Sequence, residues 1–132
     1  MPGRQSSRRQ RVLRIAFAAT ASLAAVAVSA QDVMQVGADT HGVLLENARV
    51  RVLAARVEPG GKVPMHSHPA NVVYFLGDAK VRVITPDGKS VIRDIKGGTA
   101  SWYEAVTHAV ENVGTTEFRE VQIELKDAAP GQ

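Results

Sequence analysis

The stretch GGKVPMHSHPANVVYFLG, residues 60–77, decides how the rest of the chain is interpreted. Its paired glycines follow Pro59 and favour a turn, and a second glycine-containing turn begins at Gly77. Between the turns, His66 and His68 are separated by one residue. On a β-strand both imidazoles therefore project from the same face and can reach one ion. A pair of this kind is a weak sign of metal binding by itself, so the surrounding pattern has to support it.

Outward from this stretch, the alternation of apolar and polar residues predicts an all-β domain. From Asn47 onward it has the period of two expected of half-buried strands, and no helical periodicity appears from Gln31 to the end of the chain. Pro86 and Gly88 predict the turn of a hairpin, which ends at Gly97 and Gly98. Many short strands at this spacing predict a β-sandwich or a closed barrel, folds that leave few strand edges exposed.

The last predicted strand, residues 117–125, has two chemically different faces. One face is apolar and comprises Val121, Ile123 and Leu125. The other is polar and comprises Glu120, Gln122 and Glu124. We expect the apolar face to point into the core.

The stretch that contains the two histidines resembles the first motif of the cupin superfamily. That motif runs glycine, five residues, His-x-His, three or four residues, glutamate, six residues, glycine. Gly60, His66, His68 and Gly77 stand in the corresponding places. The glutamate is absent, and Asn71 or the following valine occupies its place.

A second segment resembles the second cupin motif, which ends in histidine, three residues and asparagine. Gly97, His108 and Asn112 fit its spacing, whereas Tyr103 and Ala105 replace its inner proline and glycine. The two motifs together extend from residue 60 to residue 112. The resemblance is to a small, single-domain cupin, and it implies a double-stranded β-helix, the jelly-roll barrel of that superfamily.

The resemblance also implies a metal centre. His66, His68 and His108 correspond to the histidine ligands of the family, and without the glutamate we expect three imidazoles plus water around one divalent ion. Iron(II) is our first choice, and zinc, manganese, nickel and copper are alternatives because all accept imidazole. The alternative is that the three histidines only form hydrogen bonds inside a polar barrel.

Other residues near the motifs are candidates for the pocket. Glu104 is a candidate general acid or base, or a partner that orients an imidazole; the alternative is a solvated loop acid. The pocket candidates are Asn71, Tyr74, Trp102 and Tyr103, although aromatic side chains more often pack in a core. The fourth histidine of the chain, His41, is expected to be a solvated residue of a polar turn.

The N-terminal segment, from Met1 to Ala30, has the pattern of a helical signal peptide. Five arginines and no acid precede an uncharged run that is too short for a stable membrane span. We therefore expect a periplasmic or secreted protein, exported by the general or the twin-arginine route. The predicted organisation is a signal peptide at 1–30, a loosely structured segment at 31–45, a barrel at 46–127 and a tail at 128–132.

The charge balance argues against nucleic acid as a partner. From Gln31 onward the chain holds 11 basic and 13 acidic residues and no basic cluster with interleaved aromatics. Cysteine is absent, so neither disulfides nor thiolate ligands are available.

Two functions fit these features. The first is a metal-dependent oxygenase, or a lyase or isomerase, that acts on an oxygen-bearing small molecule. The second is a non-catalytic periplasmic module that binds a metal or a ligand. In either case a homodimer is a plausible assembly.

Overall fold

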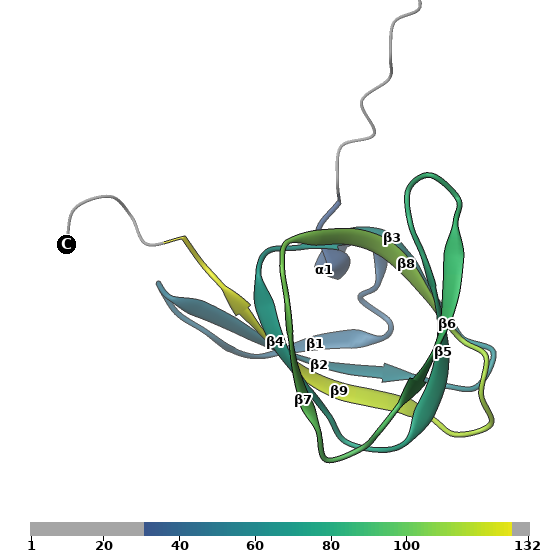
Figure 1. Ribbon diagram of the computed structural model, residues 1–132. Coiled ribbons are helices and arrows are strands. Elements are labelled where there is room, and N and C mark those ends of the chain that lie inside the picture. Colours follow the sequence, from purple (N-terminus) through teal and green to yellow (C-terminus); the bar gives the residue numbers. More distant parts are fainter. Residues whose placement is uncertain (1–30, 128–132) are drawn as a thin grey trace, which may run out of the picture.

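The computed structural model describes residues 31–127 as a barrel built from two antiparallel sheets (Figure 1). The predicted signal peptide and the predicted tail lie outside the described residues. The elements are α1 (Val33–Val36), β1 (His41–Glu46), β2 (Val50–Val57), β3 (Lys62–His68), β4 (Asn71–Phe75), β5 (Ala79–Ile84), β6 (Ser90–Ile95), β7 (Ala100–Tyr103), β8 (Val106–Asn112) and β9 (Phe118–Leu125). The all-β prediction is therefore confirmed. No helix of the described residues is long and apolar enough to span a membrane.

The strand order explains how segments distant in sequence meet. One sheet has five strands in the order β1-β2-β9-β4-β7, and the other has four in the order β3-β8-β5-β6. The two motifs meet because β3, which follows the first turn, pairs with β8 near the end of the second motif. Gly60 and Gly88 have φ angles of 79° and 81°, a conformation that favours glycine, so the two turns form where the sequence predicts them.

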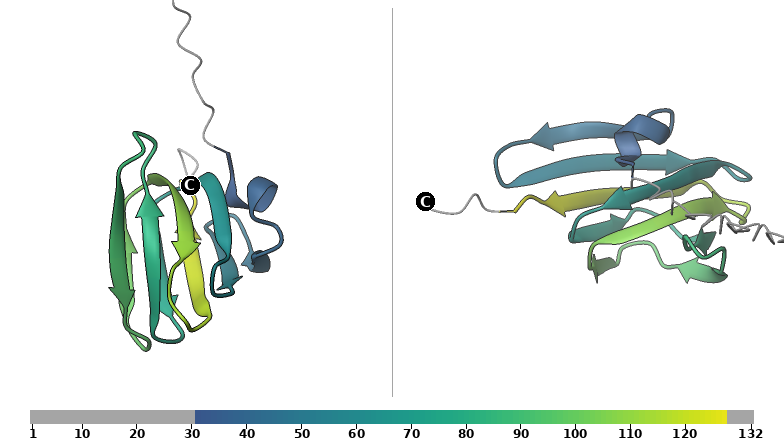
Figure 2. Two further views of the ribbon diagram at one scale, coloured as in Figure 1. Left: turned by 90° about the vertical axis from the view of Figure 1, so that its right-hand side faces the viewer. Right: turned by 90° about the horizontal axis from the view of Figure 1, so that it is seen from above.

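The segment from residue 31 to residue 45 differs from the expectation of a loosely structured end. Asp32 caps α1 through a 2.8 Å hydrogen bond from the Met34 amide, and β1 pairs with β2 along its length. The Ser67 amide donates to the Gln31 carbonyl at 2.8 Å, which ties the segment to β3. The segment lies along one side of the barrel (Figure 2). It is ordered because β1 forms an edge of the five-stranded sheet and α1 contacts β3 of the other sheet, tertiary contacts that the local sequence does not reveal.

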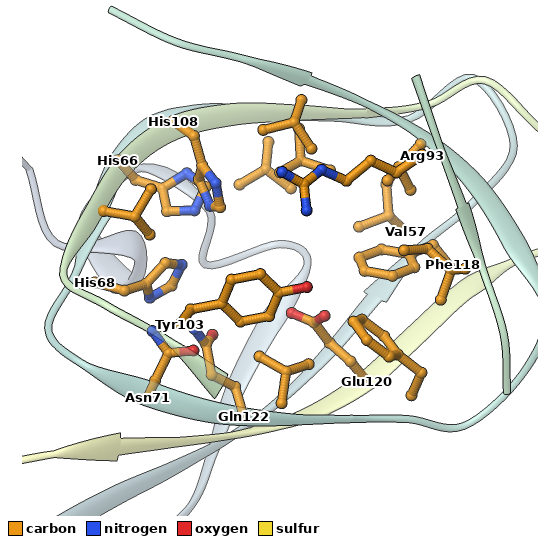
Figure 3. A pocket seen from close by; sticks show the side chains of 18 of the residues that line it. Val57, His66, His68, Asn71, Arg93, Tyr103, His108, Phe118, Glu120 and Gln122 are labelled. Atoms are coloured by element: carbon orange, nitrogen blue, oxygen red, sulfur yellow. The ribbon is translucent and has the colours of Figure 1, made fainter. Parts of the chain in front are cut away.

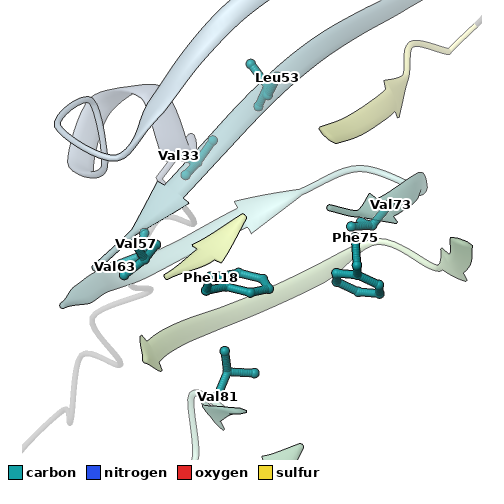
Figure 4. Packing of buried hydrophobic residues seen from close by; sticks show 8 residues of the cluster. All are labelled: Val33, Leu53, Val57, Val63, Val73, Phe75, Val81 and Phe118. Carbon is teal, nitrogen blue, oxygen red and sulfur yellow. The ribbon is translucent and has the colours of Figure 1, made fainter. Parts of the chain in front are cut away.

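The hydrophobic core occupies part of the barrel interior (Figure 4). Its buried residues are Val33, Leu53, Val57, Val63, Val73, Phe75, Val81 and Phe118. Most are β-branched or aromatic, the residue types that fit a pleated and buried surface. Val33 is fully buried, so the short N-terminal helix contributes to this core.

The orientation predicted for β9 is wrong. Gln122 and Glu124 are 3% and 1% exposed and lie on the inner face together with Phe118 and Glu120. Leu125, by contrast, is 37% exposed and belongs to the outer face. The inner face of this strand is polar because it borders the site described below, and the apolar residues consequently lie on the outside.

Candidate metal centre

Three of the predicted residues, His66, His68 and His108, converge inside the barrel (Figure 3). His66 lies opposite His108 in the pairing of β3 with β8, and His68 lies two residues further on the same face. One ring nitrogen from each histidine lies within 4.8 Å of the others. His66 and His68 are only 2% and 5% exposed. The spacing of these nitrogens suits ligands of a single metal ion.

The hydrogen bonds of two histidines determine which nitrogen faces the cluster. His66 Nδ1 donates to the Pro64 carbonyl at 2.6 Å, and His68 Nδ1 donates to Glu124 Oε1 at 2.7 Å. Both partners only accept, so each ring carries its proton on Nδ1 and keeps the lone pair of Nε2 for a ligand bond. Such partners fix the tautomer and the ring orientation of metal-binding histidines.

Glu124 is held by a second partner. Arg51 Nε donates to Glu124 Oε2 at 2.6 Å, and Arg51 Nη2 donates to Asp32 Oδ2 at 2.6 Å. Burial would raise the pKa of Glu124, but the hydrogen bonds from His68 and Arg51 outweigh it and leave the pKa below its ordinary value. The carboxylate therefore stays ionised and orients His68. This role is not evident from the sequence, because the alternation of β9 predicts that Glu124 lies on the solvent face.

His41 lies in the same pocket, which corrects its assignment as a solvated turn residue. It begins β1, is 9% exposed, and its ring centroid lies 6.2 Å from that of His66 and 6.5 Å from that of His68. Burial, followed by the neighbouring His66 and His68, lowers the pKa of His41 to about 4. The residue is therefore a neutral imidazole beside the cluster of three. Its position depends on the pairing of β1, which the sequence analysis did not predict.

The three histidines border a cavity of about 200 Å³ inside the barrel. Most of its wall is apolar, and its polar lining includes Asn71 and Tyr103, two of the predicted pocket residues. Arg93, Glu120 and Gln122 also line it, and the sequence analysis did not identify them as site residues. The side-chain oxygens Asn71 Oδ1 and Gln122 Oε1 are buried and have no hydrogen-bond partner among the described residues.

The other predicted pocket residues lie elsewhere. Tyr74 and Trp102 are 43% and 52% exposed and do not line the cavity. Glu104 is exposed and accepts a 2.7 Å hydrogen bond from Trp102 Nε1, so it does not reach the histidines. Trp102 lies outside because successive residues of a strand point to opposite faces. Asn71 pairs with Tyr103 on the inner face, so the next pair, Val72 with Trp102, points outward.

Neutral imidazoles are the form that a metal ion requires. Burial, followed by the neighbouring His66 and His68, lowers the pKa of His108 to about 3, and burial also lowers the pKa of His66. The cluster contains no carboxylate and no thiolate among its members. A set of three imidazoles suits zinc, iron, copper and nickel, and leaves further coordination positions open to a ligand from the cavity.

The fold and the histidine cluster define a class of protein, the jelly-roll barrels with a histidine site in the barrel interior. A cupin-domain protein from Bordetella pertussis Tohama I is similar to this chain: it is 35% identical, the match covers 65% of this chain and 91% of that protein, and the TM-score is 0.61. The chain therefore belongs to the cupin family. No protein-family model and no curated protein matches it significantly.

More distant structures share the fold alone. An RmlC-like cupin family protein with a double-stranded β-helix fold from Methanocaldococcus jannaschii is 10% identical, with a TM-score of 0.53 over 64% of this chain and 77% of that one. The polyketide cyclase RemF from Streptomyces resistomycificus is 20% identical, with a TM-score of 0.51 over 68% of this chain and 66% of that one.

Proposed function

We propose that the protein binds one divalent metal ion through His66, His68 and His108 and is a metal-dependent enzyme acting on an oxygen-bearing small molecule. The observation that carries this proposal is the position of the histidine cluster at the wall of a cavity inside the barrel. A structural metal site needs no such cavity, whereas a catalytic one keeps open positions toward its substrate. An oxygenase and a lyase or isomerase are both compatible with this arrangement.

The metal ion would supply Lewis acidity toward a substrate oxygen. Glu124 and the Pro64 carbonyl hold two of the imidazoles in a fixed orientation, so the ligand set is arranged before the ion binds. Much of the surrounding wall is formed by valine side chains, and an apolar environment strengthens electrostatic interactions at the site. One of the structural neighbours is a polyketide cyclase, so catalysis occurs in another protein of this fold.

The alternative is a non-catalytic module that binds a metal or a ligand without converting it. The absence of the motif glutamate favours this alternative, because three neutral imidazoles leave the full charge of a divalent ion in place. The two functions differ in turnover but not in metal binding, so metal binding is tested first.

The experiment measures metal content of the purified protein and of the variants His66→Ala and His108→Ala. We expect about one ion per chain in the wild type and loss of that ion in both variants. Glu104→Gln is the matched control because Glu104 is exposed and outside the cavity. Stoichiometric metal in both histidine variants would refute the site. Dioxygen uptake by the iron-loaded protein with diketones, thiols and hydroxy acids then separates an oxygenase from the other functions.

We also propose that the protein is exported to the periplasm by its N-terminal segment, Met1 to Ala30, as the arginine cluster and the short apolar run indicate. Fractionation of cells that produce the full chain tests this proposal. Retention in the cytoplasm would contradict it, and dependence of export on Arg8 and Arg9 would identify the twin-arginine route.

A homodimer is a further proposal, and the outer face of the five-stranded sheet supports it. An apolar row crosses all five strands in register and comprises Leu45, Val52, Ile123, Val72 and Trp102. Five strands about 4.8 Å apart span roughly 20 Å, wide enough for a standard interface of about 800 Å² per partner. Trp102→Lys is expected to convert a dimer to a monomer in sedimentation analysis; a monomeric wild type would contradict the proposal.

A further inference from the structure

Two oppositely charged side chains, Arg93 on β6 and Glu120 on β9, point into the cavity from different sheets (Figure 3). Their cross-strand neighbours establish this orientation. Arg93 pairs with Val81, which is 2% exposed, and Glu120 pairs with Phe75, which is 5% exposed. Residues paired in an antiparallel sheet project from the same face. Both side chains therefore face the cavity; Glu120 is half-buried there, whereas Arg93 also remains exposed to solvent.

Neither charge is paired within residues 31–127. No salt bridge or side-chain hydrogen bond joins Arg93 or Glu120 to another described residue, or to each other. Glu124, on the same face of the same strand, is by contrast bound by both His68 and Arg51. Burial without a partner raises the pKa of Glu120 to about 7. Glu120 is half-buried, and an acid that loses part of its hydration without gaining a partner costs stability, so the fold itself does not account for it.

The wall between the histidine cluster and Glu120 has further unpaired polar atoms. Going from Glu124 to Glu120, β9 presents Gln122 to the interior, and Gln122 Oε1 has no hydrogen-bond partner in the described part of the chain. Asn71 Oδ1, close to His68 in Figure 3, is unpaired as well. Successive inward residues of a strand lie about 7 Å apart. The polar side chains on the inner face of β9 therefore form a row that begins at Glu124, which orients His68, and ends at Glu120.

Arg93 lies on the other side of the cavity. In Figure 3 the guanidinium group of Arg93 lies on the same side of the cavity as His108, and Glu120 lies on the opposite side. A guanidinium group matches the geometry of a carboxylate and pairs with it through two hydrogen bonds. The apolar wall consists of valine and isoleucine side chains together with Phe75 and Phe118, and it suits an aliphatic carbon chain.

We propose that Arg93 and Glu120 form a substrate subsite for a small aliphatic carboxylate that carries a hydroxyl or ammonium group at its other end. Arg93 binds the carboxylate beside the metal centre, and Glu120 accepts a hydrogen bond from the donor group. The cavity of about 200 Å³ is smaller than the ~300–1,000 Å³ typical of pockets for drug-sized ligands. A ligand that fits this cavity is therefore short, and both charges face the same cavity. The inference rests on the proposed metal function only in placing the carboxylate near the ion.

The test uses the zinc-loaded full-length protein and four probes of equal chain length in two pairs. The probes are 3-hydroxypropanoate and propanoate, and 4-hydroxybutanoate and butanoate. Titration calorimetry measures their dissociation constants. In the wild type we expect at least one hydroxy acid to bind about tenfold tighter than its unsubstituted partner. Arg93→Gln should weaken binding of all four at least tenfold, and Glu120→Gln should remove the preference for the hydroxyl group.

Control measurements separate failure of this subsite from failure of the metal centre. Zinc content should remain about one per chain in Arg93→Gln, Glu120→Gln and the surface control Glu104→Gln, because none of these residues belongs to the histidine cluster. If zinc does not bind, the metal-free protein should still show selectivity that depends on Arg93 and Glu120. Equal affinity for both members of each pair, or selectivity unchanged in both variants, would overturn the subsite.

Discussion

The substitution Glu120→Gln should stabilise the metal-free protein, and the gain should grow with pH. Burial raises the pKa of Glu120 from 4.5 to about 7 in the folded state. Below pH 4.5 the carboxyl is protonated in both the folded and the unfolded chain, so it contributes no pH-dependent penalty. Between pH 4.5 and pH 7 the unfolded chain loses the proton first, so the free energy of unfolding of the wild type falls as the pH rises.

The size of this effect follows from the difference between the two pKa values. Each pKa unit corresponds to about 1.4 kcal/mol, so the wild type loses about 3 kcal/mol by pH 8, where the loss levels off. Water in the cavity would solvate the carboxylate in part, which makes this figure an upper bound. Glutamine has nearly the same shape and no charge, so Glu120→Gln removes the penalty. The difference in free energy of unfolding between the variant and the wild type should therefore be about 2–3 kcal/mol larger at pH 8 than at pH 5.

Urea unfolding at pH 5, 6, 7 and 8 measures the difference, with the single tryptophan, Trp102, as fluorescent probe. Arg93, Tyr103 and the four histidines also face this cavity, but they are the same in both proteins. Their titration therefore largely cancels in the comparison. Glu104→Gln, an exposed acid on a loop, should show no pH-dependent gain. A difference between Glu120→Gln and the wild type that stays constant from pH 5 to pH 8 would refute the reasoning.

Three further substitutions address other parts of the site. Glu124→Gln should weaken zinc binding about 10–100-fold in a chelator competition, because the neutral amide holds His68 less firmly; unchanged affinity would argue against the orienting role. His41→Ala should keep one zinc ion per chain, since its ring lies outside the cluster of ligand atoms, and loss of the ion would show that His41 is a ligand. Asn112→Ala should lower the free energy of unfolding by about 2–4 kcal/mol in urea, because its buried amide loses three hydrogen bonds to the backbone; a change below about 1 kcal/mol would contradict this.

The strands and the shared face of His66 and His68 could be predicted from sequence because both depend on local spacing, whereas the approach of His108 could be predicted only from the motif resemblance. Alternation with a period of two identifies strands, and glycine and proline identify the turns between them. His66 and His68 share a face wherever residues 66–68 form a strand. His108 joins them through the pairing of β3 with β8, and the resemblance of its motif to the cupin pattern predicted this contact without any knowledge of the register.

The orientation of β9 could not be obtained in the same way. Its residues alternate clearly, but alternation does not say which face points inward, and the usual rule assigns the apolar face to the core. In this barrel the rule fails, because Gln122 borders the cavity, Glu124 is buried against His68, and Leu125 lies outside. One residue of the strand does indicate the correct orientation. Phe118 is aromatic and lies on the same face as Glu120, Gln122 and Glu124, so it suggests that this face points inward.

The same inversion explains why the sequence does not reveal the acid that orients His68. Sequence proximity to His108 favours Glu104, and the motif position of the missing glutamate favours Asn71. The structure instead brings Glu124 to His68 from a strand 56 residues away in the chain. A strand that places acids inside a barrel and apolar side chains outside violates the pattern that stabilises a fold, and such violations are expected where function requires them. Glu124 offsets its burial through two partners, whereas Glu120 has none among the described residues, which is why Glu120 points to a ligand.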